Sequence, residues 1–241
     1  MLVDVALSPR CLPADRASEK VVVVVDVLRA GTTVAFALHH GAEAVIPVRS
    51  VGAARELARR FPGRALLCGE RRALPLAGFD LGNSPLEFTA ERVRGKVIVL
   101  TTSNATRVFY RLREPKAVAL VGLVNAPAAS RWLAALGEDV LIACAGRGGE
   151  LGIEDAFAAG VIVNGLRELV PAELTDSAFA AGQLATALGT RVKSVLWESK
   201  HGRYLRTLGL EFDLEVCAQV GTIPILAVLE EGKLVAAFPP E

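Results

Sequence analysis

Short apolar runs, separated by polar and glycine- or proline-rich segments, recur along the chain and predict alternating strands and helices. The clearest run is Val21–Val25, five consecutive β-branched residues, which is typical of a strand buried on both faces. Helical spacing of apolar residues follows most of these runs, and glycine or proline then ends the helix. The expected strands cover residues 21–25, 44–48, 65–68, 97–100, 117–121 and 140–143. The expected helices cover residues 31–40, 51–61, 104–112, 126–136 and 153–169.

Residues 69–85 interrupt this alternation, because several glycines and prolines fall there without a clean apolar period. Such a long irregular loop inside an α/β domain is often functional. After Pro171 strands become scarce, and the pattern predicts helices over residues 175–188 and 199–208. Two apolar runs at 223–229 and 234–238, separated by a polar turn containing glycine, predict a β-hairpin.

Strands that alternate with helices favour a mostly parallel sheet covered on both faces. The expected fold class is therefore an α/β three-layer sandwich with a helical excursion at about 170–220 and a C-terminal β-hairpin. We expect a single domain over residues 1–241. The alternative is a division into two domains near residue 170.

Composition narrows the class of protein. Of 241 residues, 52% are hydrophobic and 22% are charged, which excludes a disordered chain. The net charge of +1 gives no global attraction to nucleic acid or an anionic membrane, so neither is an expected partner. The four cysteines form no C-x-x-C pair, and no signal peptide or membrane-length apolar run is seen. These features predict reduced thiols and a cytoplasmic protein; a homo-oligomer is left open.

The ends of the predicted strands carry the candidate chemistry, because ligands of parallel sheets bind beyond those ends. Asp26 follows the valine run directly, and a carboxylate there suits Mg²⁺, while Arg29 could hold an anion beside it. Glu70 follows the strand at 65–68 as a candidate metal ligand or base, with Arg71 as an anion clamp. The plainer alternatives are a helix cap for Asp26 and a solvated charged turn for Glu70.

Two further loops have the composition of anion sites. Asn83 and Ser84 lie in a glycine-containing turn, with Ser84-Pro85 typical of the start of a short helix. The loop after the strand at 97–100 is dense in hydroxyl and amide groups. These candidate phosphate ligands are Thr101, Thr102, Ser103, Asn104 and Thr106. A helix N-terminus with such donors can bind phosphate, whereas a simple cap would use only one or two of them.

The loop after the strand at 140–143 contains Cys144, a candidate nucleophile, and Gly146 and Arg147, candidate ligands of an anion. Glu154 and Asp155 follow in the first turn of the next helix. These two acids are candidate metal ligands, or acids that interact favourably with the helix dipole. The chain lacks a Walker phosphate loop, a complete G-x-G-x-x-G and an H-x-x-x-H pair.

Taken in order, these loops resemble the 2-phosphosulfolactate phosphatases, the ComB-like proteins of coenzyme M biosynthesis. The resemblance rests on DVLRAGTT (26–33), GER (69–71), GFDLGNSP (78–85), TTSNAT (101–106), CAG…EDAFAAG (144–160) and VCAQ…IP (216–224). It implies a Mg²⁺-dependent phosphoric monoester hydrolase that converts (2R)-2-phospho-3-sulfolactate to 3-sulfolactate and phosphate.

The residues themselves point to the same kind of reaction, the metal-assisted hydrolysis of a small anionic phosphomonoester. Asp26 and Glu70 are the first candidates for metal or base roles, and Glu154 and Asp155 are further candidate metal ligands. A covalent route through Asp26 or Cys144 is an alternative. So are a phosphatase of other 2-hydroxy-acid phosphates and a non-catalytic protein that binds small anions.

Overall fold

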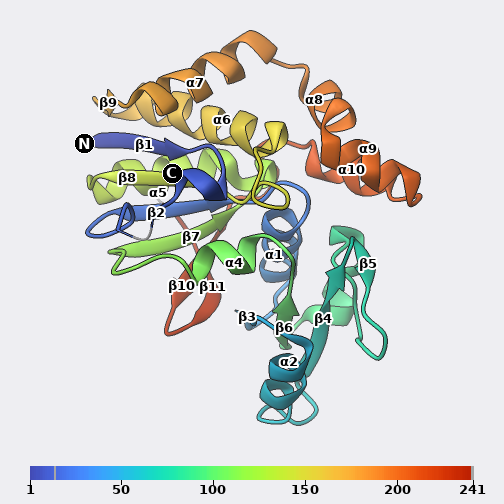
Figure 1. The fold of residues 1–241 in the computed structure, drawn as a ribbon. Helices are drawn as coiled ribbons and strands as arrows, with labels where there is room; N and C mark the ends of the chain where they lie inside the picture. The colour runs from blue at the N-terminus through green and yellow to red at the C-terminus, as the bar shows by residue number, and fades with distance from the viewer. Residues whose placement is uncertain (14, 240–241) are drawn as a thin grey trace.

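The computed structural model describes residues 1–13 and 15–239 and contains one eleven-stranded sheet in the order β5-β4-β6-β3-β11-β10-β7-β2-β8-β1-β9 (Figure 1). The strands are β1 (Leu2–Ala6), β2 (Val21–Val25), β3 (Ala44–Pro47), β4 (Ala65–Arg71), β5 (Leu74–Pro75), β6 (Val97–Thr101), β7 (Ala117–Val121), β8 (Val140–Cys144), β9 (Glu173–Leu174), β10 (Leu226–Glu230) and β11 (Lys233–Ala237). The α-helices are α1 (Ala30–His39), α2 (Val51–Ala58), α3 (Ala90–Val93), α4 (Ala105–Phe109), α5 (Ala126–Leu136), α6 (Ile153–Leu169), α7 (Asp176–Leu188), α8 (Val192–Glu198), α9 (Lys200–Thr207) and α10 (Glu211–Cys217).

The valine run forms the centre of the three layers. Val21, Val23 and Val25 pack toward α5, α6 and α7 on one face of the sheet, while Val22 and Val24 pack toward α1 and α4 on the other. All five side chains are buried, as alternation along a doubly covered strand requires. The predicted α/β three-layer sandwich is thereby confirmed.

Two parallel blocks of strands make up most of the sheet, and the C-terminal hairpin joins them. The strands β4, β6 and β3 form one block, and β7, β2, β8, β1 and β9 form the other. The antiparallel hairpin β10–β11 lies between them, with β10 paired to β7 and β11 paired to β3. Glu231 and Gly232 both have positive φ, which suits the tight turn of a two-residue hairpin. The predicted hairpin is confirmed, and its position in the middle of the sheet was not predicted.

The two blocks run in different directions, and their loops meet near the start of α1 (Figure 1). Hydrogen bonds record this convergence. The Asp26 carboxylate, after β2, accepts from the backbone N–H of Ala105, after β6, and Glu70 at the end of β4 accepts from that of Ser103.

Several boundaries differ from the predicted ones. The 69–85 segment is less irregular than expected, because β4 continues to Arg71 and pairs with β5 across a turn. β1 was not predicted, since Asp4 interrupts its apolar pattern; the structure buries Asp4 beside Arg16, which donates to both carboxylate oxygens. Within the excursion, α7 and α9 match the two expected helices, whereas α8 and α10 were not expected.

The parts before and after residue 170 share one sheet, because β9 and the hairpin join the earlier strands. The number of domains itself stays a prediction. Among the described residues no helix is both long and apolar enough to span a membrane. All four cysteines are free, and Cys68 and Cys144 are buried as predicted.

Helix α6 packs so closely on α7 that Gly160 is required at the crossing, because a Cβ there would overlap the Ala181 carbonyl oxygen. We expect Gly160→Ala to lower the free energy of unfolding by about 1–3 kcal/mol, because overpacking forces backbone shifts. The control is Gly52→Ala in the first turn of α2, where a Cβ meets only the Ser50 side chain at 3.9 Å. That variant should not lower the free energy of unfolding, because the contact is an ordinary van der Waals one and Ala is the better helix former. Urea midpoints measure both, and equal effects of the two substitutions would contradict the close packing.

Candidate functional site

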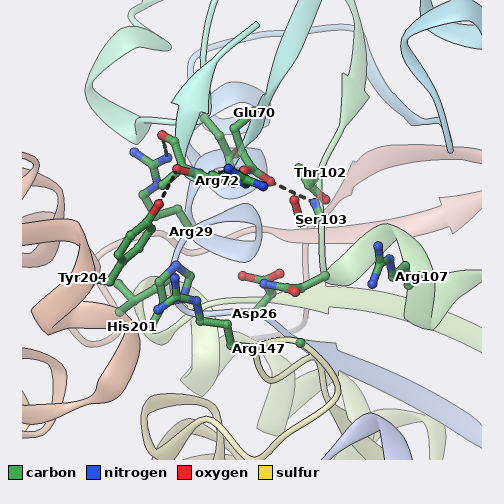
Figure 2. Close-up of a pocket in the computed structure, with 15 residues that line it drawn as sticks. Asp26, Arg29, Glu70, Arg72, Thr102, Ser103, Arg107, Arg147, His201 and Tyr204 are labelled. Atoms are coloured by element: carbon green, nitrogen blue, oxygen red, sulfur yellow. Dashed lines mark hydrogen bonds between the residues drawn. The ribbon is translucent and has the colours of Figure 1, made fainter. Parts of the chain in front are cut away.

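A cavity of about 240 Å³ lies where the loops after β2, β4, β6 and β8 meet helix α9 (Figure 2). Of the residues predicted from sequence, those that line it are Asp26, Arg29, Glu70, Asn83, Thr102, Ser103, Asn104 and Arg147. The predicted residues outside its lining are Arg71, Ser84, Thr101, Thr106, Cys144, Gly146, Glu154 and Asp155.

Asp26 is buried at the inner end of the cavity and joins two helix starts. Its Oδ1 accepts from the backbone N–H of Ala30 at 3.1 Å, and its Oδ2 from that of Ala105 at 3.2 Å. Burial raises the pKa of Asp26 to about 7, with the charges of Glu70 and Glu154 adding to the rise and the two backbone hydrogen bonds opposing it. The cap expected as the plain alternative is therefore present at α1, and the same carboxylate also anchors α4.

Glu70 fixes the opposite wall. Its Oε2 accepts from the backbone N–H of Ala73 at 2.8 Å and its Oε1 from that of Ser103 at 2.9 Å, the latter shown by a dashed line in Figure 2. The side chain is only 7% exposed, so the solvated turn considered as an alternative is wrong. Glu70 thus ties the turn between β4 and β5 to the loop after β6.

Asp155 lies behind the cavity rather than in it. Its two oxygens accept from the backbone N–H groups of Val27 and Gly146, both at 2.8 Å, so it connects the loops after β2 and β8. Burial raises its pKa, and the charges of Glu154 and Asp26 raise it further. Burial likewise raises the pKa of Glu154.

The four predicted acids therefore do not form one metal cage. Among the described residues, no group of three or more His, Cys, Asp or Glu side chains is arranged to hold a metal ion by itself. The reason is that both oxygens of Asp155 accept hydrogen bonds from backbone N–H groups behind the cavity, while Asp26 and Glu70 line the cavity itself.

Asp26, Glu70 and Asn83 nevertheless fit a Mg²⁺ ion that takes its other ligands from water and substrate. All three line the cavity, and Asn83 Oδ1 is buried with no hydrogen-bond partner among the described residues. Each carboxylate oxygen of Asp26 and Glu70 accepts one backbone N–H group, and a carboxylate oxygen has room for a second partner.

Arg29 is fixed by a buried ion pair. Its Nη1 lies 2.5 Å from Asp213 Oδ2 of α10, and its Nη2 donates to the Ala73 carbonyl at 2.7 Å. Ser84 is the N-cap residue of a 3-10 helix over Pro85–Glu87, as predicted, but its hydroxyl makes no capping bond and donates to the other oxygen of Asp213 at 2.5 Å. Ser84 therefore supports Arg29 through Asp213 and does not face the cavity.

The loop after β6 supplies polar groups from only part of its length. Thr102, Ser103 and Asn104 line the cavity, whereas the Thr101 hydroxyl accepts from Arg71 Nη2 at 3.0 Å. Thr106 reaches the loop through its hydroxyl, 3.0 Å from that of Thr102. Of the five predicted hydroxyl and amide side chains, three therefore line the cavity. The other two, Thr101 and Thr106, contact residues outside its lining or at its edge.

Cys144 does not fit the nucleophile role predicted for it. It is 1% exposed within the core between the sheet and α6, and it is absent from the cavity lining. Burial raises the pKa of its thiol, and the nearby Asp155 and Glu154 add to the rise. A buried neutral thiol is a poor nucleophile, so we leave it out of the site.

The wall contributed by α9 was missed from sequence. Tyr204 stacks against the Arg147 guanidinium, whose carbon lies 4.1 Å from the ring centre, and donates its hydroxyl to the Arg72 carbonyl at 3.0 Å (Figure 2). His201 lines the same wall. Burial lowers its pKa to about 3, with Arg147 and Arg29 adding to the effect, so it is neutral and its 3.8 Å approach to Glu154 is not an ion pair.

The full set of lining residues that sequence reasoning missed is Leu28, Arg72, Ala73, Arg107, Gly148, His201 and Tyr204. Arg72 and Arg107 directly follow motifs that the sequence analysis singled out, and that position was the available signal. No sequence signal marked His201 or Tyr204, because only the fold brings α9 to the strand ends.

Comparisons with known proteins find relatives along most of the chain. Residues 6–232 match the family described as 2-phosphosulpholactate phosphatase. The chain is 42% identical over 225 residues to a probable 2-phosphosulfolactate phosphatase of Symbiobacterium thermophilum, covering 92% of this chain and 97% of that protein. Proteins of the same name from Thermotoga petrophila and Carboxydothermus hydrogenoformans are both 38% identical, over 231 and 237 residues. Those two alignments cover 96% and 98% of this chain and 96% and 97% of the two relatives.

Because the pKa of Asp26 is raised, we expect the stability of the metal-free protein to fall as pH rises. Because its folded pKa is above that of the unfolded chain, the stability associated with the protonated carboxyl is complete below about pH 4 and is lost as pH rises through about 7. Asp26→Asn removes this ionisation. In metal-free buffer, we expect the melting temperature of Asp26→Asn minus that of wild type to rise by several degrees between pH 5.5 and 8.

We also expect a difference in melting temperature that does not depend on pH, because the Asn side chain must place its NH₂ group against one backbone N–H. Asp4→Asn is the control. The pKa of Asp4 is lowered, since hydrogen bonds from Arg16 and Thr175 outweigh its burial, so its contribution is lost only as pH falls. Its melting-temperature difference should be flat over the same range. A flat difference for Asp26→Asn as well would contradict the buried ionisation.

Proposed function

Because this chain belongs to the 2-phosphosulpholactate phosphatase family, we propose that it hydrolyses 2-phospho-3-sulfolactate to 3-sulfolactate and inorganic phosphate. Water adds to phosphorus, the bond from phosphorus to the C2 oxygen breaks, and that oxygen takes up a proton. The single observation that supports this reaction best is that one cavity collects two carboxylates, a loop rich in hydroxyl groups and four arginines.

The charges of the cavity suit such a substrate, which carries phosphate, sulfonate and carboxylate groups. The arginines in the lining are Arg29, Arg72, Arg107 and Arg147. Guanidinium groups bind these oxyanions through paired N–H donors and stay charged at any physiological pH. The near-neutral protein thereby places positive charge where an anion binds without carrying it over the whole surface.

Two of these arginines are held in place before a substrate arrives. Arg29 is fixed by Asp213 and the Ala73 carbonyl, and Arg147 by its stack on Tyr204. Donors that are already oriented need no rearrangement when charge develops on the phosphoryl oxygens. We propose that they orient the substrate, while the polar groups of Thr102, Ser103 and Asn104 contact the phosphate.

We further propose Mg²⁺ as the cofactor, held by Asp26 and Glu70 with the Asn83 amide oxygen beside them. The support is the set of oxygen ligands described above, with an unpartnered buried acceptor among them. When bound, the ion would neutralise charge on the phosphate oxygens and polarise the phosphoryl group. We place the reaction in the cytoplasm, since the free cysteines suit a reducing compartment.

A phosphate-release assay tests the proposal. With 2-phosphosulfolactate and Mg²⁺ we expect hydrolysis, and with a chelator a loss of at least a hundredfold that added Mg²⁺ restores. Phosphate esters of other 2-hydroxy acids, such as 2-phospholactate, lack the sulfonate and should react more slowly. Equal rates across the panel would favour a phosphatase of 2-hydroxy-acid phosphates in general. Release from no ester would favour an anion-binding protein, and full activity in chelator would refute the Mg²⁺ requirement.

The loop after β6 gives a second test. Replacing Thr102 and Asn104 together by Ala removes two polar groups that line the cavity, and hydrogen bonds to a charged ligand contribute about 1.5–3 kcal/mol each. We expect inhibition by inorganic phosphate to weaken at least tenfold. Thr101→Val is the control, because its hydroxyl is turned to Arg71 outside the cavity. Similar inhibition constants for wild type and both variants would mean that the loop only caps α4.

A further inference from the structure

A second cavity, of about 400 Å³, adjoins the first across the loop after β6 and has a strongly cationic wall. We call it the arginine pocket, defined by Arg49, Arg71, Arg107 and Arg111. Thr102 and Ser103 line both cavities, and so does Arg107, which extends from α4 on the side of Asp26 away from Tyr204 (Figure 2). The remaining lining is Thr106 and Tyr110.

The four guanidinium groups have no counter-charge of their own. Among the residues that the structure describes, none of them forms an ion pair with a carboxylate, although ion pairs occur at Arg16, Arg29 and Arg64. The chain as a whole has nearly as many acids as bases, 26 against 27. A cluster of four unpaired positive charges at one concave surface is therefore a local departure from the charge balance, and it costs Coulombic repulsion unless an anion is bound.

Two of these arginines are held at the pocket by their contacts, whereas Arg111 donates to the Pro9 carbonyl at 2.9 Å. Arg71 is half-buried and donates to the Glu70 carbonyl at 2.6 Å and to the Thr101 hydroxyl at 3.0 Å. Arg49 stacks on Tyr110, with 4.0 Å from the guanidinium carbon to the ring centre. A stacked guanidinium keeps its in-plane N–H donors available to an oxyanion.

We propose that the arginine pocket binds a small oligophosphate, an anion with at least two adjacent phosphate groups, separately from the phosphatase cavity. The charge decides between this ligand and a single phosphate, since a monophosphate would neutralise at most half of four guanidinium charges. The volume agrees, because this pocket is larger than the cavity that would take the three-carbon substrate. Neighbouring guanidinium groups also suit paired recognition of adjacent phosphate oxygens.

Calorimetric titration with inorganic pyrophosphate, in buffer freed of divalent cations, tests this without relying on catalysis. The test variant is Arg49→Gln with Arg111→Gln, two residues that line the arginine pocket but not the phosphatase cavity. The matched control is Arg59→Gln with Arg60→Gln, which removes the same charge from the exposed far end of α2. Arg147 lines the phosphatase cavity but not the arginine pocket, so Arg147→Gln alters only the phosphatase cavity.

We expect wild type and the Arg59/Arg60 control to bind pyrophosphate at a site that Arg147→Gln retains and that the Arg49/Arg111 variant loses or weakens at least tenfold. That site should prefer pyrophosphate to inorganic phosphate. Undiminished binding in the Arg49/Arg111 variant would overturn the proposal, and so would equal losses in the control. Arg49→Gln alone serves if the double variant folds poorly.

Hydrolysis by the same variants separates this inference from the proposed function. The Arg49/Arg111 variant should keep kcat/KM for 2-phosphosulfolactate within twofold of wild type. A tenfold rise in KM would make these arginines part of the substrate site and overturn a separate pocket. If no ester is hydrolysed by any form of the protein, the proposed function fails while the pyrophosphate titration still decides this inference.

Discussion

The site depends on buried carboxylates that accept hydrogen bonds from the backbone of neighbouring loops. Asp26, Glu70 and Asp155 each use both oxygens in this way, and each joins two separate segments of chain. Such charge-assisted bonds are strong, but the desolvation of a carboxylate is expensive. The same groups therefore give the loops a defined position, and their burial beside one another raises the pKa of Asp26 and of Asp155, because negative charge is costly there. The surrounding arginines, and the cation that we propose, offset that charge.

This double use explains why the two interpretations of Asp26 were not true alternatives. The sequence places Asp26 at a strand end, and either a cap or a ligand role was consistent with the pattern. In the structure Asp26 caps α1 and also lines the cavity, so the local and the chemical roles coincide. Asp155 shows the opposite outcome, because its position in the first turn of α6 says nothing about its contacts with Val27 and Gly146.

Sequence predicted what depends on local order and left out what depends on distant packing. The valine run, the alternation of strands and helices and the hairpin were accessible, because apolar period and turn residues determine them. β1 was hidden by an acid that the fold pairs with Arg16. Asp213, His201 and Tyr204 reach the site only because the excursion after α7 folds back over the strand ends. No pattern near these residues records the ion pair between Arg29 and Asp213, which are 184 positions apart.

The hairpin has a consequence for the way the protein is made. β3 and β7, which flank it, leave the ribosome long before the hairpin does, and Val45 must wait for Leu234 to complete its sheet edge. Until then each half of the sheet exposes a strand edge in its interior, and such edges invite pairing with other chains. Helices α5, α6 and α7 can already cover one face of the β2 block during synthesis. The β3 block can likewise pack against α1 and α2 as they are made, so the edges of β3 and β7, and not the faces of the sheet, are what the last residues of the chain protect.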